Sequence, residues 1–365
     1  MKFKKNELIA ALKTSALVKP ESVTIYPRNG ELRINAQGRG FGGVVAQSTL
    51  KSEEMAVDEA SFQVAFDRFR AIVDAMPGDT VTIALDGKSS AHVASGRTRL
   101  RIAAVYDPAI DEIDTNSVSN AETTCSFDGS VLSGAIGLVS HAMAENDMRY
   151  FLNGMHVHVR KDGGTDVVAT DGHRMVINRI KAKTASAEFR ATIAPSAVHL
   201  LKSMSGEGDV ELTIVGKVLI AKRGDWFCRM ALYDEYAKGY DRIIPKTCSS
   251  TFDVSRLELA SSFRRVMVAN EDRKHQSVLA NGDGSGNIVI ALASDATSKD
   301  EITVPQCSAF EYAVNGDYVT DFLAACQDDT VQVSIEGHNR MIIAPKGAVD
   351  HDSSAYVSVI MGMRV

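Results

Sequence analysis

The sequence of 365 residues contains few cysteines, and none of them forms a Cys-x-x-Cys pair. The cysteines are odd in number and far apart: Cys125, Cys228, Cys248, Cys307 and Cys326. This pattern argues against a disulfide framework and against a cysteine-rich zinc site. We therefore expect a protein of a reducing compartment, and the cytoplasm is the predicted location.

Long apolar segments are missing as well. No run approaches the ~20 residues that a membrane helix needs, and the first residues, M-K-F-K-K, do not start a signal peptide. The sequence also lacks the glycine-rich loop that holds phosphate before a helix, since Gly282, Gly284 and Gly286 lie between two predicted strands. We predict neither a membrane association nor a bound cofactor.

An excess of positive charge is the third missing feature. Lys and Arg number 40 against 46 Asp and Glu, which gives a formal net charge of −6. A protein that binds nucleic acid through a basic surface is usually positively charged, so this class is disfavoured. With 45% hydrophobic and 24% charged residues, the composition is otherwise that of an ordinary globular protein.

What the sequence does contain is a threefold repeat of apolar residues. The frame Phe-x4-Leu-x2-Ala occurs at Phe3, Leu8 and Ala11, at Phe127, Leu132 and Ala135, and at Phe252, Leu257 and Ala260. Each frame predicts a short strand followed by an amphipathic helix, over residues 6–18, 130–143 and 255–270. Asn6, Ser130 and Ser255 are residue types that favour the start of a helix, and we expect them to be the N-caps.

A second apolar frame follows each first frame by roughly half a repeat. It occurs at Val64, Phe69 and Ile72, at Ile193, Val198 and Leu201, and at Val314, Val319 and Phe322. These frames predict helices over residues 67–76, 195–204 and 317–326. After each helix, short alternating segments separated by turn residues predict antiparallel hairpins.

The chain therefore divides into six units of about 61 residues, and two units make one domain. The predicted fold class is α+β, with three similar domains that each pack two helices on antiparallel sheets. The predicted domains are residues 1–117, 121–245 and 246–365. A polar segment, N-S-V-S-N at 116–120, separates the first two.

Few residues suggest catalysis. The most enzyme-like segment is D-G-H-R at 171–174, which places an acid two residues from a general base. No nucleophile or metal-ligand set accompanies it, and Asp-Gly is a common turn element, so a turn is the preferred interpretation. His156 and His158 share one face of a predicted strand, but a metal site needs three or four ligands. We predict neither catalytic residues nor a metal site.

Basic residues give a weak signal for nucleic acid. Arg97, Arg99 and Arg101 share one face of a predicted strand, and Arg264 and Arg265 lie on the fifth predicted helix. Over the six helices, however, basic residues barely outnumber acidic ones, so the predicted helix layer is weakly cationic at most. The segment 356–365 is apolar to its end, which predicts a last strand or, with its methionines, an adaptable surface for peptide partners.

Three segments together resemble one known family. They are D-M-R-Y-F-L-N-G-M at 147–155, A-T-D-G-H-R at 169–174 and M-G-M-R at 361–364. With the three αβ repeats, they resemble the bacterial sliding clamp, the β subunit of the DNA polymerase III holoenzyme. The resemblance covers essentially the whole chain and is strongest from about 122 to 245 and at the C-terminus.

The resemblance implies a head-to-tail homodimer that closes into a ring around duplex DNA, with its helices lining the hole. Such a ring is not an enzyme: it tethers the polymerase catalytic subunit, and it binds the clamp loader and repair proteins through short peptides. Contacts to phosphate carry no sequence information, so DNA binding would be sequence-independent. A negative net charge is compatible with a ring, because only its inner wall faces phosphate. We expect Lys and Arg to concentrate there and the acidic excess to lie outside.

The resemblance also assigns residues to three surfaces. The partner-peptide pocket would be formed by Leu152, Thr170, Gly172, His173, Arg174, Met175, Arg242, Ile243, His338, Val359, Ile360, Met361, Gly362, Met363 and Arg364. DNA would be contacted by Lys19, Asn146, Arg149, Tyr150, Phe151, Arg264 and Arg265. The dimer interface would include Arg68, Leu100, Val268, Asp300 and Glu301.

Three positions depart from the family pattern. Gly362 and Lys238 replace prolines, and His338 replaces a small apolar residue of the pocket wall. We therefore expect a looser and more polar pocket. Two alternatives to a replication clamp stay open: a hydrolase that uses Asp171 and His173, and a ring-forming scaffold without a role in replication.

Overall fold

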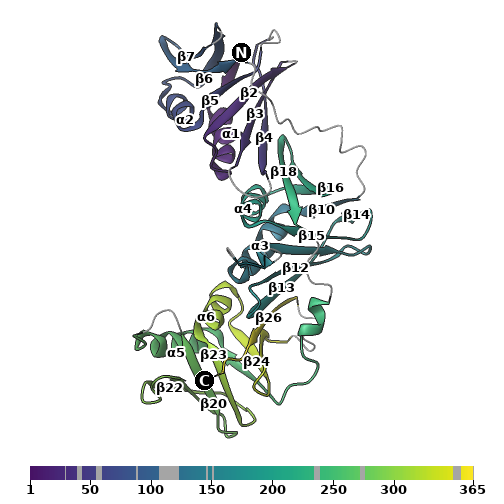
Figure 1. The fold of residues 1–365 in the computed structure, drawn as a ribbon, viewed down its shortest axis with the longest axis vertical. Coiled ribbons are helices and arrows are strands. Elements are labelled where there is room, and N and C mark those ends of the chain that lie inside the picture. The colour runs from purple at the N-terminus through teal and green to yellow at the C-terminus, as the bar shows by residue number, and fades with distance from the viewer. Residues whose placement is uncertain are drawn as a thin grey trace.

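The computed structural model describes residues 1–28, 30–38, 43–54, 60–87, 89–106, 123–144, 147–149, 152–233, 239–271, 276–347 and 355–364. Figure 1 shows an elongated, curved molecule, with the helices along its concave side and a long run of strands along its convex side. No helix in these ranges is long and apolar enough to cross a membrane.

The chain repeats one order of elements three times. The first copy consists of β1 (Lys2–Lys4), α1 (Lys5–Leu17), β2 (Ser22–Arg28), β3 (Glu31–Gln37), β4 (Val45–Lys51), β5 (Phe62–Ala65), α2 (Phe66–Ala75), β6 (Thr80–Asp86), β7 (Ser90–Ser95), β8 (Thr98–Ala103) and β9 (Val105–Tyr106). The second consists of β10 (Thr123–Asp128), α3 (Gly129–Val139), η2 (Ser140–Ala142), β11 (Met155–Val159), β12 (Gly164–Thr170), β13 (Arg174–Lys181), β14 (Thr184–Ala185), β15 (Phe189–Ile193), α4 (Pro195–Met204), β16 (Asp209–Val215), β17 (Val218–Arg223), β18 (Trp226–Tyr233) and η4 (Tyr240–Ile243). The third consists of β19 (Ser250–Ser255), α5 (Arg256–Val268), β20 (Ser277–Gly282), β21 (Asn287–Leu292), β22 (Lys299–Thr303), β23 (Phe310–Asn315), α6 (Gly316–Ala325), β24 (Thr330–Glu336), β25 (Arg340–Pro345) and β26 (Tyr356–Met361).

The three copies confirm the predicted α+β class, and all six predicted helices are present. Their ends agree with the prediction to within a few residues; α3 ends early, and its last predicted turn continues as the 3-10 helix η2. The predicted domain ends at 117 and 121 lie outside the described residues. The end at 245 lies between η4 and β19 and stays a prediction.

The N-cap predictions are only partly right. Ser255 does cap α5, because its side chain accepts a hydrogen bond from the backbone N–H of the third helical residue. Asp128, not Ser130, caps α3, and α1 begins after Lys4 without a side-chain cap. The predictions for Ser130 and Asn6 are wrong because each of these residues is the second residue of its helix.

The third apolar frame is shifted by two residues from its predicted place. Leu257 is 61% exposed, whereas Leu259 is 5% exposed and packs in the core. Because α5 begins at Arg256, the buried leucine is its fourth residue, as are Leu8 in α1 and Leu132 in α3. Two residues turn a helix by about 200°, so Leu257 lies on the other side of α5 from Leu259, although Ala260 of the same frame is buried as predicted.

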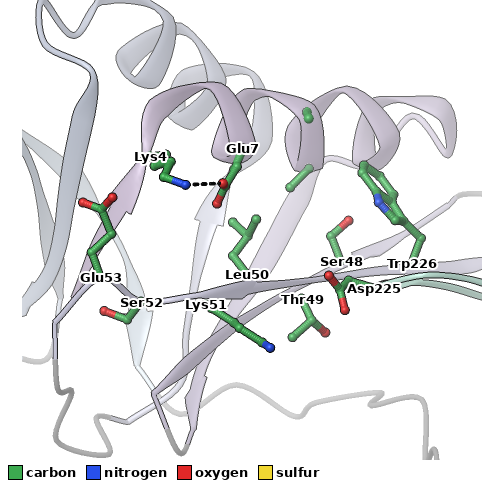
Figure 2. Close-up of a pocket in the computed structure, with 12 residues that line it drawn as sticks. Lys4, Glu7, Ser48, Thr49, Leu50, Lys51, Ser52, Glu53, Asp225 and Trp226 are labelled. Atoms are coloured by element: carbon green, nitrogen blue, oxygen red, sulfur yellow. Dashed lines mark hydrogen bonds and ion pairs between the residues drawn. The ribbon is translucent and has the colours of Figure 1, made fainter.

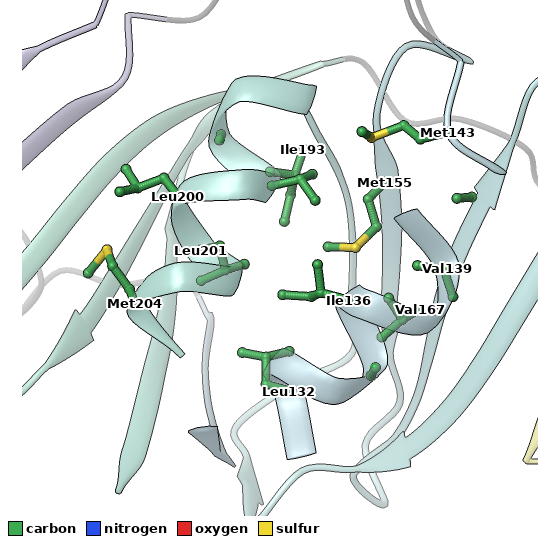
Figure 3. Close-up of a cluster of buried hydrophobic side chains, with 14 of the residues drawn as sticks. Leu132, Ile136, Val139, Met143, Met155, Val167, Ile193, Leu200, Leu201 and Met204 are labelled. Carbon is green, nitrogen blue, oxygen red and sulfur yellow. The ribbon is translucent and has the colours of Figure 1, made fainter. Parts of the chain in front are cut away.

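The helices of each copy pack together on the strands behind them. Figure 3 shows this core in the second copy, where Leu132 and Ile136 of α3 and Leu201 of α4 are fully buried over Met155 of β11. Burying one such side chain stabilises the fold by ~1.5–3 kcal/mol. The paired helices are therefore fixed to the sheets and form a continuous layer along the concave side.

One basic side chain ties the end of the second helix to the rest of each copy. Lys5 of α1 donates to carbonyl oxygens at the end of α2, and Arg256 of α5 donates in the same way at the end of α6. Gly129 occupies this position in the second copy, and Arg223 of β17 makes the contacts at the end of α4 instead. A cation here satisfies carbonyls that the helix itself leaves unpaired.

Two antiparallel strand orders recur in every copy. The first is β5-β2-β3-β4, then β15-β11-β12-β13, then β23-β20-β21-β22. The second is β1-β6-β7-β8, then β10-β16-β17-β18, then β19-β24-β25-β26. The copies thus share topology as well as element order.

The repeat also holds residue by residue across the first strand order. In each copy we take the residue that lies two positions before the second helix and follow its paired partners across the sheet. The first copy gives Val64, Val23, Ala36 and Ala46, and the second gives Ile193, Met155, Ala169 and Val176. The third gives Val314, Val278, Leu292 and Ser298, the residue directly before β22. Ala46, Val176 and Ser298 are therefore equivalent positions at the outer strand of each sheet.

Neighbouring copies join by pairing these outer strands. β4 pairs with β18, where Ala46 lies opposite Cys228, and β13 pairs with β26, where Val176 lies opposite Ser358. Cys228 and Ser358 are each the third residue of their strand, so the two junctions have the same register. Within the described residues, β22 and β8 each have a strand on one side only.

Candidate functional site

An apolar cluster covers the junction between β13 and β26 on the sheet face that points away from the helices. We call it the seam cluster; its buried members are Val168, Met175, Ile177, Tyr240, Ile244, Ile342, Ala344, Val357 and Val359. Ile243 and Cys248 pack at its edge and are only partly buried. Residues from the second copy, from η4 and from the third copy thus form one apolar surface, and Met175, Ile243 and Val359 are predicted pocket residues.

The other predicted pocket residues differ in how exposed they are. Met361 is 39% exposed, and its backbone N–H donates to the carbonyl of His173 at 2.8 Å, which brings the C-terminal strand to the loop between β12 and β13. Exposed residues here are Gly172, His173, Arg242 and Arg364, while Thr170 and Leu152 are buried and Met363 is half-buried. Ile360 does not face the seam cluster, because its side chain is buried in the main core on the opposite face.

The D-G-H-R segment forms a tight turn. Asp171 Oδ1 accepts from the backbone N–H groups of His173 and Arg174, at 2.9 and 3.0 Å, and Thr170 Oγ1 accepts from the N–H of Gly172. The Asp171 carboxylate is thus engaged in shaping the loop, which weakens the hydrolase interpretation. No group of three or more His, Cys, Asp or Glu side chains in the described ranges is arranged to hold a metal ion.

Arg174, a predicted pocket residue, directs its side chain to the helix layer, where it joins two copies. Its guanidinium pairs with Asp171 at 3.1 Å and with Asp321 of α6 at 2.7 Å, and it donates to the carbonyl of His141. It also lies 4.4 Å from the ring centre of Tyr318. Burial, and then the charge of Arg174, lower the pKa of His141 to about 4.

Arg149 is exposed, and its side chain is held in place by neighbouring groups. It pairs with Asp147 at 2.9 Å, and its hydrogen bonds lower the pKa of Asp147 to about 2. The same guanidinium donates to the carbonyl of Asp171, and a Cβ at Gly172 would lie 2.8 Å from it. This close approach, with a φ of +87°, explains the glycine. Three further predicted DNA contacts, Asn146, Tyr150 and Phe151, lie outside the described residues.

The structure explains one of the three departures from the family pattern, the glycine at 362. Gly362 donates its N–H to the carbonyl of Asn339 at 2.8 Å, and a Cβ on it would collide with the carbonyl oxygen of His338. A proline would remove the donor and create the collision. The side chain of His338 is exposed in the turn between β24 and β25, and Lys238 lies outside the described residues.

A buried polar network that the sequence analysis did not identify as functional lies under η4. The Tyr240 hydroxyl donates to Asp166, which is 2% exposed and also pairs with Arg160 at 2.5 Å and Arg179 at 3.6 Å. Burial alone would raise the pKa of Asp166, but the hydrogen bonds from Arg160 and Tyr240 outweigh it and hold this pKa below its ordinary value. The pair of histidines on β11 was the available signal, since His158 completes the network.

The helix layer carries charges of both signs. Lys19, with a φ of +50°, is exposed after α1, and Arg264 is exposed on α5, whereas Arg265 pairs with Asp300 at 2.5 Å. α3 has no charged residue, and α6 contributes Asp317 and Asp321. This distribution is less cationic than the inward concentration of Lys and Arg that we expected.

The predicted dimer residues lie at the two open ends of the arc. Leu100 is 39% exposed on β8, and Val268 is 87% exposed at the end of α5. Arg68 is exposed on α2. Asp300 and Glu301 lie on the edge strand β22, which pairs with β21 on one side, and Glu301 pairs with Lys299 at 3.1 Å.

A cleft that the sequence did not predict lies at the other internal junction. Figure 2 shows it between α1, the end of β4 and Trp226, with a volume of about 540 Å³. Lys4 and Glu7 pair across its rim at 3.2 Å, and Lys51 and Asp225 add further charges. A second hollow of about 530 Å³ adjoins it at Trp226.

The comparison with known families and relatives points in one direction. The model of the central domain of the DNA polymerase III beta subunit matches residues 126–235. The beta sliding clamp of Vibrio cholerae is 28% identical over 320 residues, which cover 86% of this chain and 84% of the relative.

Solved structures of similar proteins share the whole fold. The DNA polymerase III beta subunit of Thermotoga maritima matches with a TM-score of 0.86 at 20% identity, over 100% of this chain and 99% of the other. A sliding clamp of Pseudomonas aeruginosa bound to griselimycin matches with the same TM-score, identity and coverage.

Proposed function

We propose that this chain, which belongs to the bacterial β sliding clamp family, acts as one protomer of a two-chain ring that encloses duplex DNA. The ring tethers the replicative polymerase to its template and so gives it processivity. It performs no chemistry of its own. This assignment places the chain in the cytoplasm, at the replication fork.

The repeated strand register is the observation that carries the ring. β4 to β18 and β13 to β26 are the same pairing made twice, and β22 and β8 are the third pair of equivalent strands. Because these two edges belong to opposite ends of one chain, we expect them to pair head to tail between chains, as the family's two-chain ring requires. The same register would put Ser298 of one protomer opposite Leu100 of its partner.

The side chains at the two ends support this closure. Counted from the helix start, Val268 of α5 corresponds to Leu17 of α1, and Ala71 of α2 corresponds to Leu200 of α4. Leu17 and Leu200 belong to helices that pack against each other at an internal junction, α1 and α4. Closure would remove the exposed Val268 from water and add one more pair of helices to the layer.

Enclosure explains how an acidic chain can stay on DNA. A closed ring cannot leave circular DNA, so retention needs no tight phosphate contacts, and the mixed charges of the helix layer leave the ring able to slide. Exposed cations such as Lys19 and Arg264 would meet phosphates without reading bases. DNA binding is therefore sequence-independent.

The seam cluster and its exposed rim form the partner groove. A short peptide with apolar anchors fits a surface that Met175, Ile243 and Val359 line and that Met361 borders. The polymerase catalytic subunit, the clamp loader and repair proteins would compete for it. Griselimycin, to which a solved P. aeruginosa clamp is bound, is the ligand that we choose to test the groove.

Retention on circular DNA tests this function. The chain is loaded by a clamp loader on nicked circular DNA, and the bound fraction is followed by gel filtration before and after a restriction enzyme linearises the circle. We expect the protein to remain on the circle and to leave once the ends are free. Protein that stays bound to linear DNA with open ends would refute topological retention, and a scaffold without a clamp role would not be retained at all.

A further inference from the structure

Tyr240 connects the partner groove to the interior of the second copy. It is the first residue of η4, it is 5% exposed, and its ring belongs to the seam cluster while its hydroxyl reaches Asp166. Asp166 lies on β12 and is held by Arg160 and Arg179 from neighbouring strands. One side chain thus belongs both to the apolar surface and to the charged network beneath it.

His158 completes this anchor from β11. A carboxylate only accepts, so the Tyr240 hydroxyl hydrogen is directed to Asp166. His158 Nδ1 lies 3.2 Å from the Tyr240 oxygen on the other side. The other ring nitrogen of His158 lies 3.1 Å from Glu188. His156 also packs edge-on against the Tyr240 ring, with 5.9 Å between ring centres. Contacts from β11 and β12 therefore fix both the position and the direction of Tyr240.

The other end of η4 contributes to the groove wall. Ile243 lies at the edge of the seam cluster and Ile244 lies within it. The helix has a single turn, closed by Arg242 N–H donating to Gly239 and Ile244 N–H donating to Asp241. A helix this short has little stability of its own, so its place on the sheet depends on side-chain anchors.

We propose that Tyr240, with Asp166 and His158, positions Ile243 as the wall of the partner groove and thereby sets the affinity for apolar peptide anchors. These residues do not touch the peptide; they act through η4. The inference rests on the proposed function, because it assumes that the seam cluster is where partners bind. It adds three residues that neither the resemblance nor the composition assigned to the site.

The test uses Tyr240→Phe in the full chain, with Tyr356→Phe as a matched control. Both substitutions remove one hydroxyl at the same junction, but the Tyr356 hydroxyl donates to the carbonyl of Leu138 on the helix side, away from the groove. Griselimycin affinity is measured by isothermal titration calorimetry, and the unfolding midpoint of each variant is recorded. We expect Tyr240→Phe to weaken binding by about five- to tenfold and Tyr356→Phe to leave it unchanged, with similar midpoints.

A double-mutant cycle separates positioning from a general loss of structure. Ile243→Ala should weaken griselimycin binding, and Tyr240→Phe should then add little, because the wall that it positions is already gone. Hydrogen exchange of the amides of residues 242–244 should accelerate in Tyr240→Phe and not in Tyr356→Phe. Equal affinities for wild type and Tyr240→Phe, or strictly additive effects with Ile243→Ala, would overturn the inference.

DNA retention distinguishes this failure from a failure of the function. Tyr240→Phe should be retained on circular DNA like wild type, since it leaves the ring ends unchanged. If wild type is retained but Tyr240→Phe binds griselimycin normally, only the positioning role is wrong. If wild type is retained and binds no griselimycin, both the groove assignment and this inference are wrong.

Discussion

The two internal junctions of the chain have the same strand register but opposite side-chain chemistry. Between the second and third copies, Arg174 joins Asp321, Tyr318 and the backbone of His141 in a polar clamp. The equivalent positions between the first and second copies, by strand register and helix count, are Val44, Leu200, Ala197 and Leu17, all of them apolar. The backbone pairing therefore sets how the copies join, and the side chains are free to specialise.

This difference has a functional consequence. Arg174 is the last residue of the turn at 170–174 and the first residue of β13, and it pairs with Asp171 of the same turn. A partner that touches the turn therefore acts on the same residues that dock the third copy against the second. The junction at β4 and β18 has no such link in the described residues, and open clefts flank Trp226 there. We infer that the groove is coupled to one junction and not to the other.

The largest expected contrast comes from two equivalent aromatic residues. Tyr356 is the first residue of β26 and Trp226 is the first residue of β18, and each of these strands makes one internal junction. Tyr356 is 5% exposed and stacks on Phe322, with ring centres 4.6 Å apart. Trp226 instead borders two clefts. Tyr356→Ala should lower the free energy of unfolding by about 3–4 kcal/mol, and Trp226→Ala by about 1–2 kcal/mol. Urea unfolding measures both, and equal losses would remove the claimed difference in packing.

A smaller effect is expected from replacing the polar clamp by the apolar pattern of the other junction. Arg174→Val should cost about 2–3 kcal/mol, because Asp171 and Asp321 lose their charged partner. Adding Asp321→Leu should recover part of this loss, since an apolar pair of similar volume suits a semi-buried site. If Arg174→Val is neutral in urea unfolding, or if Asp321→Leu adds a further loss, the polar clamp does not stabilise the junction.

The smallest expected effect per residue is that of pH, and it should arise from two buried histidines, His141 beside the polar clamp and His156 beside Tyr240. Burial lowers the pKa of His141 to about 4; Arg174 lowers this pKa further and Asp321 raises it. Burial also lowers the pKa of His156 to about 4, where His158 and Arg190 act in the same direction and Asp166 acts against them. The unfolded chain takes up these protons near pH 6.5 and the folded chain only near pH 4, so the unfolded state binds more protons in between. Stability is therefore full above pH 6.5 and falls as the pH drops.

We expect each of the two histidines to lower the free energy of unfolding by about 1.2 kcal/mol between pH 7 and pH 5.5, and both together by about 2.5 kcal/mol. Urea titrations at a series of pH values measure it. His156→Gln should flatten the profile, whereas His199→Gln, which removes an exposed histidine on α4, should not. A profile that does not change between wild type and His156→Gln would show that the buried histidine is not its source.

The fold could be predicted well from the sequence because apolar residues recur at helical spacing at the same place in each copy, and this pattern locates the helices. The prediction was wrong at Leu257. This leucine completes the apolar frame in the sequence, but it is exposed, and the buried leucine of α5 lies two residues further along. Two of the segments that the sequence assigned to the groove, at 169–174 and 361–364, do meet in the structure, where the Met361 N–H donates to the carbonyl of His173. The sequence could not show that Arg174 turns away to Asp321, because that contact joins residues of two copies far apart in sequence. Nor could it assign Tyr240, whose role depends on a buried carboxylate 74 residues away.

The register of ring closure is the central claim, and cross-linking tests it directly. Leu100→Cys with Ser298→Cys should form a disulfide-linked dimer under mild oxidation, whereas Leu100→Cys with Lys299→Cys should not, because a shift of one residue points the side chain to the other face of the sheet. The wild type controls for its five native cysteines, four of which are buried. Efficient cross-linking of the first pair alone would support closure in the internal register, and cross-linking of the second pair instead, or of neither, would contradict it.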